Sequence, residues 1–153
     1  MKNILKILLS LLPLTLFTSC KSQTPFVVQL PIENKALVYI YFPESLSLNE
    51  DYFYSIFDIY INDKRVEHTI KSSEYRAFNI KPDTIHFRIK RASIEHKDIT
   101  LELKEGETYY LKIEDNLDSN DFEFYLQESE KAKEEISKKC KSSVDESIYS
   151  EDN

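Results

Sequence analysis

The stretch that decides the fold is Thr84-Ile85-His86-Phe87-Arg88-Ile89-Lys90-Arg91, in which apolar and polar side chains alternate. Ile85, Phe87 and Ile89 fall on one side of an extended chain, and His86, Arg88 and Lys90 fall on the other. Successive side chains of a β-strand point to opposite faces of a sheet. The stretch is therefore predicted to be a strand with one face in the core and the other in solvent.

Further strands are predicted on both sides of this stretch, because the same alternation recurs between turn signals. The predicted strands are residues 26–30, 35–42, 52–61, 65–70, 74–80, 99–103, 107–114 and 122–126. The turns between them are Asn62-Asp63-Lys64, Ser72-Ser73, Pro82-Asp83 and a hairpin loop at Lys104-Glu105-Gly106. Gly106 is the one glycine of the chain, and it can take the positive φ that such a loop requires.

The period changes after Gln127, where a helix is predicted. Ser129 suits the N-cap, and Ala132, Ile136 and Cys140 form one narrow apolar stripe. Two acid-before-base pairs at i,i+4, Glu134 with Lys138 and Glu135 with Lys139, support the helix as far as about Lys141. Residues 142–153 are polar, acidic and predicted to be disordered. The fold class is thus mainly β, an antiparallel β-sandwich with one C-terminal α-helix, in a single domain of residues 26–141.

The N-terminal region has the order of a secretory signal: Lys2 and Lys6, an apolar run over residues 7–17, then small Thr18 and Ser19 before Cys20. The run is too short for a membrane-spanning helix and contains a proline. The segment resembles a bacterial prolipoprotein signal. That resemblance implies a signal peptide of residues 1–19, a lipidated Cys20, and a linker over residues 20–25. An ordinary cleaved signal that leaves Cys20 as a thiol, and an uncleaved anchor helix, are the alternatives.

Charge excludes some partners. The whole chain has a net charge of −7, and removal of residues 1–19 takes away two lysines and no acid, which leaves −9. An acidic domain repels nucleic-acid phosphates and anionic lipid headgroups, so we expect no nucleic-acid partner.

Three short motifs carry a resemblance to a known family: an opening strand at residues 36–43, a hairpin turn at residues 59–64, and Glu105-Gly106-Glu107-Thr108-Tyr109-Tyr110-Leu111. Over residues 35–140 the chain resembles the domain-of-unknown-function 2846 family of small bacterial lipoproteins. The resemblance implies a β-sandwich and an envelope location, and it brings no known activity.

No catalytic or metal site is predicted. The sequence has no Gly-x-Ser-x-Gly, His-Glu-x-x-His, Walker or Cys-x-x-Cys motif. The spacing of His68, His86 and His96 does not bring them together as zinc ligands, so we expect solvated histidines and no cofactor. Cys140 is the expected free thiol; its neighbouring lysines favour the thiolate, and the helix C-terminus opposes it.

Two functions follow as expectations. The first is a non-catalytic, membrane-anchored envelope lipoprotein that binds another envelope protein, through a sheet edge for example. The second is a lipoprotein that binds glycans or small ligands on exposed tyrosine platforms at Tyr39, Tyr41, Tyr109 and Tyr110, although tyrosines at core edges are the preferred interpretation. Lys21 stands where an inner-membrane retention signal would have an acid, which favours the outer membrane, on its periplasmic side.

Overall fold

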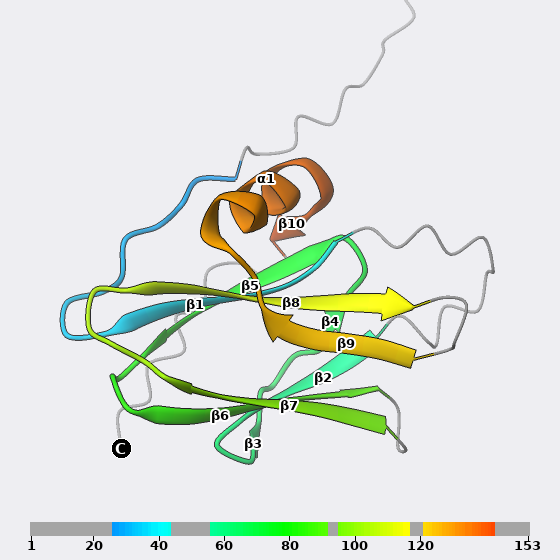
Figure 1. The fold of residues 1–153 in the computed structure, drawn as a ribbon, viewed down its shortest axis with the longest axis horizontal. Helices are drawn as coiled ribbons and strands as arrows, with labels where there is room; N and C mark the ends of the chain where they lie inside the picture. Colours follow the sequence, from blue (N-terminus) through cyan, green and yellow to red (C-terminus); the bar gives the residue numbers. More distant parts are fainter. Residues whose placement is uncertain (1–25, 44–55, 92–94, 117–120, 143–153) are drawn as a thin grey trace, which may run out of the picture.

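The computed structural model describes residues 26–43, 56–91, 95–116 and 121–142. Two sheets pack face to face, and one helix lies on the outer face of the first sheet (Figure 1). The β-sandwich with a single C-terminal helix that the alternation predicts is therefore confirmed.

The first sheet has the order β10-β5-β1-β8-β9. Its strands are β1 (Ala36–Phe42), β5 (Glu74–Ile80), β8 (Thr108–Asn116), β9 (Asp121–Leu126) and β10 (Lys141–Ser142). The central strand β1 pairs antiparallel with β5 and parallel with β8. A parallel pair needs a long connection, and here the whole second sheet lies between the two strands in sequence.

The second sheet has the order β3-β2-β6-β7, and β4 also pairs with β2. Its strands are β2 (Ile56–Ile61), β3 (Lys64–Arg65), β4 (Ile70–Lys71), β6 (Thr84–Arg91) and β7 (Glu95–Glu102). All of its pairs are antiparallel.

The main core lies between the two sheets and follows the alternation. On β6 the three inner apolar side chains are buried, and the histidine and Arg88 on the other face are only half-buried. On β1 both faces are buried, because the second face is covered by α1 (Ser129–Lys139). Leu37, Tyr39 and Tyr41 there form a second, smaller core with Ala132 and Ile136.

The helix differs from its prediction in two details. Its N-cap is Glu128, whose carboxylate accepts hydrogen bonds from the backbone N–H groups of Glu130 and Lys131 at 2.9 and 3.0 Å. Capping needs only a side-chain acceptor that reaches the free N–H groups, which here comes one residue before Ser129. The helix ends at Lys139. Ser142, expected in the disordered tail, belongs to β10 and pairs with Tyr75 of β5.

Several local predictions are wrong. The predicted strand at residues 65–70 is replaced by the short strands β3 and β4, and residues 66–69 lie in no strand. The strand predicted at 99–103 begins at Glu95, as β7. Residues 26–30 form no strand; the segment is extended but makes no ladder with a neighbouring strand. The turn at Gly106, with φ of 75°, is not a hairpin loop, because it leads from β7 in the second sheet to β8 in the first. Residues 52–55 of one predicted strand, residues 143–153 of the predicted tail and everything before residue 26 lie outside the described residues.

Candidate functional site

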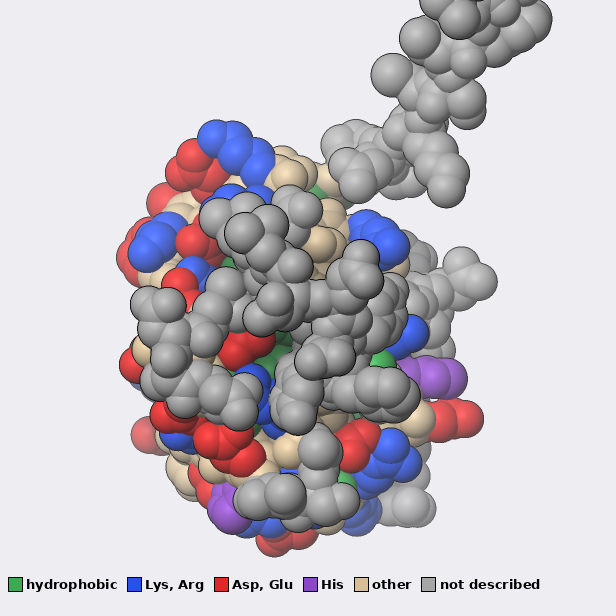
Figure 2. Space-filling view, turned by 90° about the vertical axis from the view of Figure 1, so that its right-hand side faces the viewer, with side chains coloured by type: hydrophobic (Ala, Val, Ile, Leu, Met, Phe, Trp, Pro, Cys, Tyr) green, Lys and Arg blue, Asp and Glu red, His purple; other side chains and the backbone are tan. Residues whose placement is uncertain are grey.

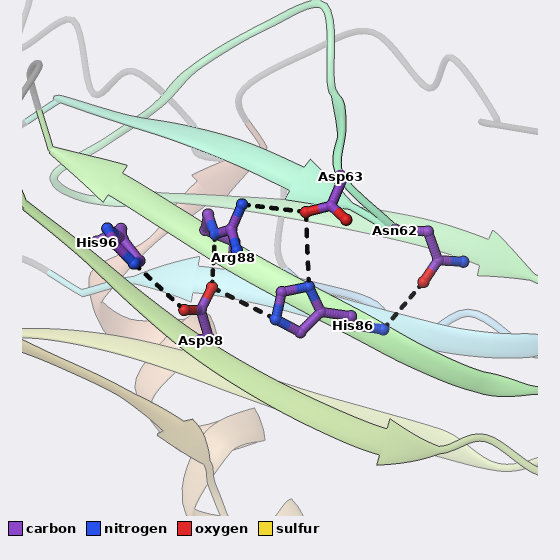
Figure 3. Close-up of polar contacts among 6 residues, drawn as sticks. All are labelled: Asn62, Asp63, His86, Arg88, His96 and Asp98. Carbon is purple, nitrogen blue, oxygen red and sulfur yellow. Dashed lines mark hydrogen bonds and ion pairs between the residues drawn. The ribbon is translucent and has the colours of Figure 1, made fainter.

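Polar side chains gather on the outer face of the second sheet, the face turned away from the core (Figure 3). We name this group the outer-face cluster, and its members are Asn62, Asp63, His86, Arg88, His96 and Asp98. They come from the β2–β3 turn, from β6 and from β7, which are neighbours in the sheet.

The turn between β2 and β3 brings one carboxylate to the cluster. Asn62 and Asp63 have φ values of 48° and 62°, the left-handed conformation that a tight hairpin turn requires and that Asn and Asp tolerate. The Asn62 Oδ1 atom accepts a hydrogen bond from the His86 backbone N–H at 3.0 Å, and the Asn62 N–H donates to the His86 carbonyl at 2.8 Å. The turn is therefore fixed to β6 by the side chain and the backbone N–H of Asn62.

Arg88 is held between two carboxylates. Its Nε atom lies 2.7 Å from Asp98 Oδ1, and its Nη1 atom lies 3.0 Å from Asp63 Oδ1. The hydrogen bond to Asp98 and the charges of both acids raise the pKa of Arg88. The side chains of Arg88 and Asp98 are about one-third exposed and that of Asp63 is 73% exposed, so such pairs contribute little to stability, but they orient the guanidinium.

Two histidines share the same acid. The Nε2 atoms of His86 and His96 each lie 3.5 Å from Asp98, one at each carboxylate oxygen. His86 and His96 lie nearer to each other than their spacing along the chain indicates, because the β6–β7 register brings residues of both strands to one place. His68 is elsewhere, with its carbonyl accepting from Arg76. Among the described residues, no group of three or more His, Cys, Asp or Glu side chains is arranged to hold a metal ion.

The cluster lies beside an open strand edge. β7 pairs with β6 along its whole length, and no described strand pairs with its other side, which we name the β7 edge. Thr100 lies opposite His86, whose backbone groups both face Asn62. In an antiparallel ladder, opposite residues both turn their backbone groups either toward each other or away, so those of Thr100 point out from the β7 edge. Glu102, two residues on, has the same orientation, and its carbonyl oxygen lies 3.3 Å from the Tyr109 hydroxyl oxygen.

The four tyrosines do not form the exposed platform that the second predicted function requires. Tyr39, Tyr41 and Tyr110 are at most 2% exposed, because α1 and neighbouring rings cover them. Tyr109 is half-buried, and its hydroxyl donates to Glu107 at 2.7 Å and accepts from the Lys104 N–H at 3.0 Å. The preferred interpretation of tyrosines at core edges fits these positions.

A polar network under α1 was not predicted. The Tyr41 hydroxyl donates to Glu135 Oε2 at 2.8 Å, and buried Lys112 lies 3.2 Å from Glu135 and 3.0 Å from Glu114. Burial and the nearby carboxylate of Glu135 raise the pKa of Tyr41. Glu135 thus joins the helix to the sheet, where the sequence suggested a surface pair with Lys139.

Cys140 is a free thiol that lies at the end of the helix, half-buried against the smaller core. Burial, with a smaller effect from Glu135, raises its pKa from 9.0 to about 12, against the opposing charges of Lys139 and Lys112. Desolvation therefore outweighs the lysines that the sequence suggested would favour the thiolate.

Cys20 and the predicted signal lie outside the described residues. In the part of the chain that the structure describes, no helix has the length and hydrophobicity needed to cross a membrane. No protein-family model matches the chain, and no curated protein matches it either.

Proposed function

We propose that the chain is a lipid-anchored protein of the bacterial envelope whose β-sandwich binds another envelope protein along the β7 edge, without catalysing a reaction. The observation that carries this proposal is the open side of β7, an eight-residue strand whose outward backbone groups at Thr100 meet no neighbouring strand among the described residues. An extended segment of a partner can add to such an edge by main-chain hydrogen bonds.

The outer-face cluster supports the same proposal. His96 and Asp98 belong to β7 itself, and Asp98 is joined to Arg88 on the next strand. An added strand would therefore lie beside side chains that are already oriented. Main-chain bonds would supply affinity, and these polar side chains would select the partner.

Because of the proposed anchor, a modest affinity for the partner is sufficient. A domain held at the membrane through Cys20 meets membrane-bound partners at high effective concentration. The lipoprotein-like signal and the family resemblance over residues 35–140 support an envelope location, on the periplasmic side of the outer membrane. Acidic and basic side chains are interspersed on the face drawn in Figure 2, while the net charge favours neutral or basic partners.

A photo-crosslinking experiment tests the proposal. A photo-reactive side chain at His96, which is 55% exposed beside the β7 edge, is expected to give one adduct of discrete mass with an envelope protein in cells. The matched control is the same group at Ser137, an exposed position on α1. An equal yield of the same adduct from Ser137 would rule out the β7 edge as the binding site.

A further inference from the structure

The exposed apolar side chains of the described residues gather in one segment. Val27, Val28, Leu30 and Ile32 are 70%, 40%, 87% and 39% exposed, and Leu126 is the one other large hydrophobic residue exposed in the described ranges. The segment Phe26-Val27-Val28-Gln29-Leu30-Pro31-Ile32 contains no charged residue, although charged residues make up 31% of the chain. We name residues 27–32 the N-terminal strip.

The strip is fixed to the domain through its backbone and through Phe26, the residue before it. Phe26 packs edge-on against Tyr39 and Tyr75, with ring centroids 5.5 and 5.2 Å apart. The Gln29 N–H donates to the Tyr39 hydroxyl, and the Ile32 N–H donates to Asn79 Oδ1, both at 3.0 Å. These bonds order an extended segment while leaving its aliphatic side chains in solvent, which is costly unless something covers them.

The position of the strip suggests what covers it. It lies on the side of the first sheet that carries α1, opposite the second sheet (Figure 1). Phe26, the residue before the strip, directly follows the predicted linker of residues 20–25, and a fully extended chain reaches about 20 Å at most from Cys20 to Phe26. A lipid on Cys20 would therefore hold the strip within reach of the bilayer surface.

The chemistry of the strip favours lipid over protein. Its exposed side chains are aliphatic, whereas the residues that dominate protein interfaces are Trp, Tyr and Arg, with Leu and Val under-represented. Because the strip has no charge, it can enter the headgroup boundary without bringing the acidic surface of the domain against anionic lipids.

We propose that the N-terminal strip lies in the lipid headgroup region next to the anchor and orients the domain, with the α1 side toward the bilayer and the second sheet away from it. The inference rests on the proposed lipid at Cys20. In this orientation the open β7 edge lies away from the bilayer, because β7 belongs to the second sheet, which is the layer farther from the membrane.

Tryptophan fluorescence can test this contact, because the chain has no tryptophan. Residues 20–153 carrying Leu30→Trp are joined through Cys20 to a maleimide lipid in phosphatidylcholine vesicles with brominated acyl chains. Thr100→Trp, exposed on the second sheet, is the matched control, and Cys140→Ser in both proteins leaves one thiol. We expect the bromolipids to quench Leu30→Trp at least threefold more than Thr100→Trp, with a blue-shifted emission for Leu30→Trp alone.

Equal quenching of the two variants would overturn the inference. Because the lipid is attached chemically, this outcome does not depend on acylation in cells. The mass of the Cys20 peptide from cells reports the anchor separately: a peptide without a lipid would overturn the proposed anchor but not the affinity of the strip for a lipid surface.

Discussion

Phe87→Ala is expected to lower the free energy of unfolding by about 3–5 kcal/mol, the usual cost of removing a fully buried aromatic side chain. Phe87 is 0% exposed, in the middle of β6, opposite Ile61 on one side and Ile99 on the other. Alanine would leave a cavity between the two sheets that rigid neighbouring strands cannot close. Such a loss is a large share of the stability of an ordinary domain.

Urea unfolding of Phe87→Ala beside His86→Ala measures this effect. His86 is the adjacent residue on the outer face, so its replacement is expected to change the free energy of unfolding by less than about 1 kcal/mol. A loss below about 1 kcal/mol for Phe87→Ala would mean that β6 does not direct this face into the core.

Arg91→Met is expected to have a cost of similar size, about 3–5 kcal/mol, because it breaks a buried ion pair. The side chain of Arg91 is 5% exposed, and its Nη1 atom lies 3.0 Å from the carboxylate of Asp115, which is 7% exposed. The guanidinium also lies over the ring of Phe122, 5.1 Å from its centroid. Without Arg91, the Asp115 carboxylate would be buried without this partner.

The pH dependence of the free energy of unfolding and a second substitution distinguish the loss of the ion pair from a loss of packing. Burial already raises the pKa of Asp115, and the charge of Arg91 opposes that rise. Removing Arg91 raises the pKa further, so the deficit of Arg91→Met should grow as pH rises from about 4 to 8. Arg91→Met with Asp115→Leu should recover much of the loss. A deficit that is independent of pH and unchanged in the double variant would contradict the ion-pair explanation.

The sequence predicts the faces of single strands well, because alternation depends only on local order. On β6 the three predicted inward residues are buried, together with Arg91 on the same face, and the stripe of Ala132 and Ile136 is the buried face of α1. Partners that are distant in sequence are not predictable in this way. The turn at Gly106 has the chemistry of a hairpin loop, but whether the next strand pairs with β7 or with β1 depends on packing of the whole sheet.

The candidate site shows the same limit. His86, His96 and Asp98 meet because β6 and β7 pair in one particular register, which no spacing along the chain expresses. The sequence predicts a strand at residues 26–30, but the backbone N–H groups of Gln29 and Ile32 bond to the side chains of Tyr39 and Asn79 and not to a neighbouring strand. Composition predicts that such a segment is extended, but it does not predict that its aliphatic side chains are exposed to solvent.

One measurement tests the central claim, tethered binding through the β7 edge, most directly: the yield of the crosslinked adduct from His96 in cells that also carry a change at Thr100 or Cys20. Thr100→Pro removes an outward N–H and puts a ring at the edge without breaking a bond to β6, so it should fold normally. Thr100→Ala, which keeps the N–H, is its control. The proposal predicts full yield for Thr100→Ala, at least a tenfold loss for Thr100→Pro, and a loss for Cys20→Ala that overexpression restores. An undiminished adduct in Thr100→Pro and Cys20→Ala at normal levels would contradict it.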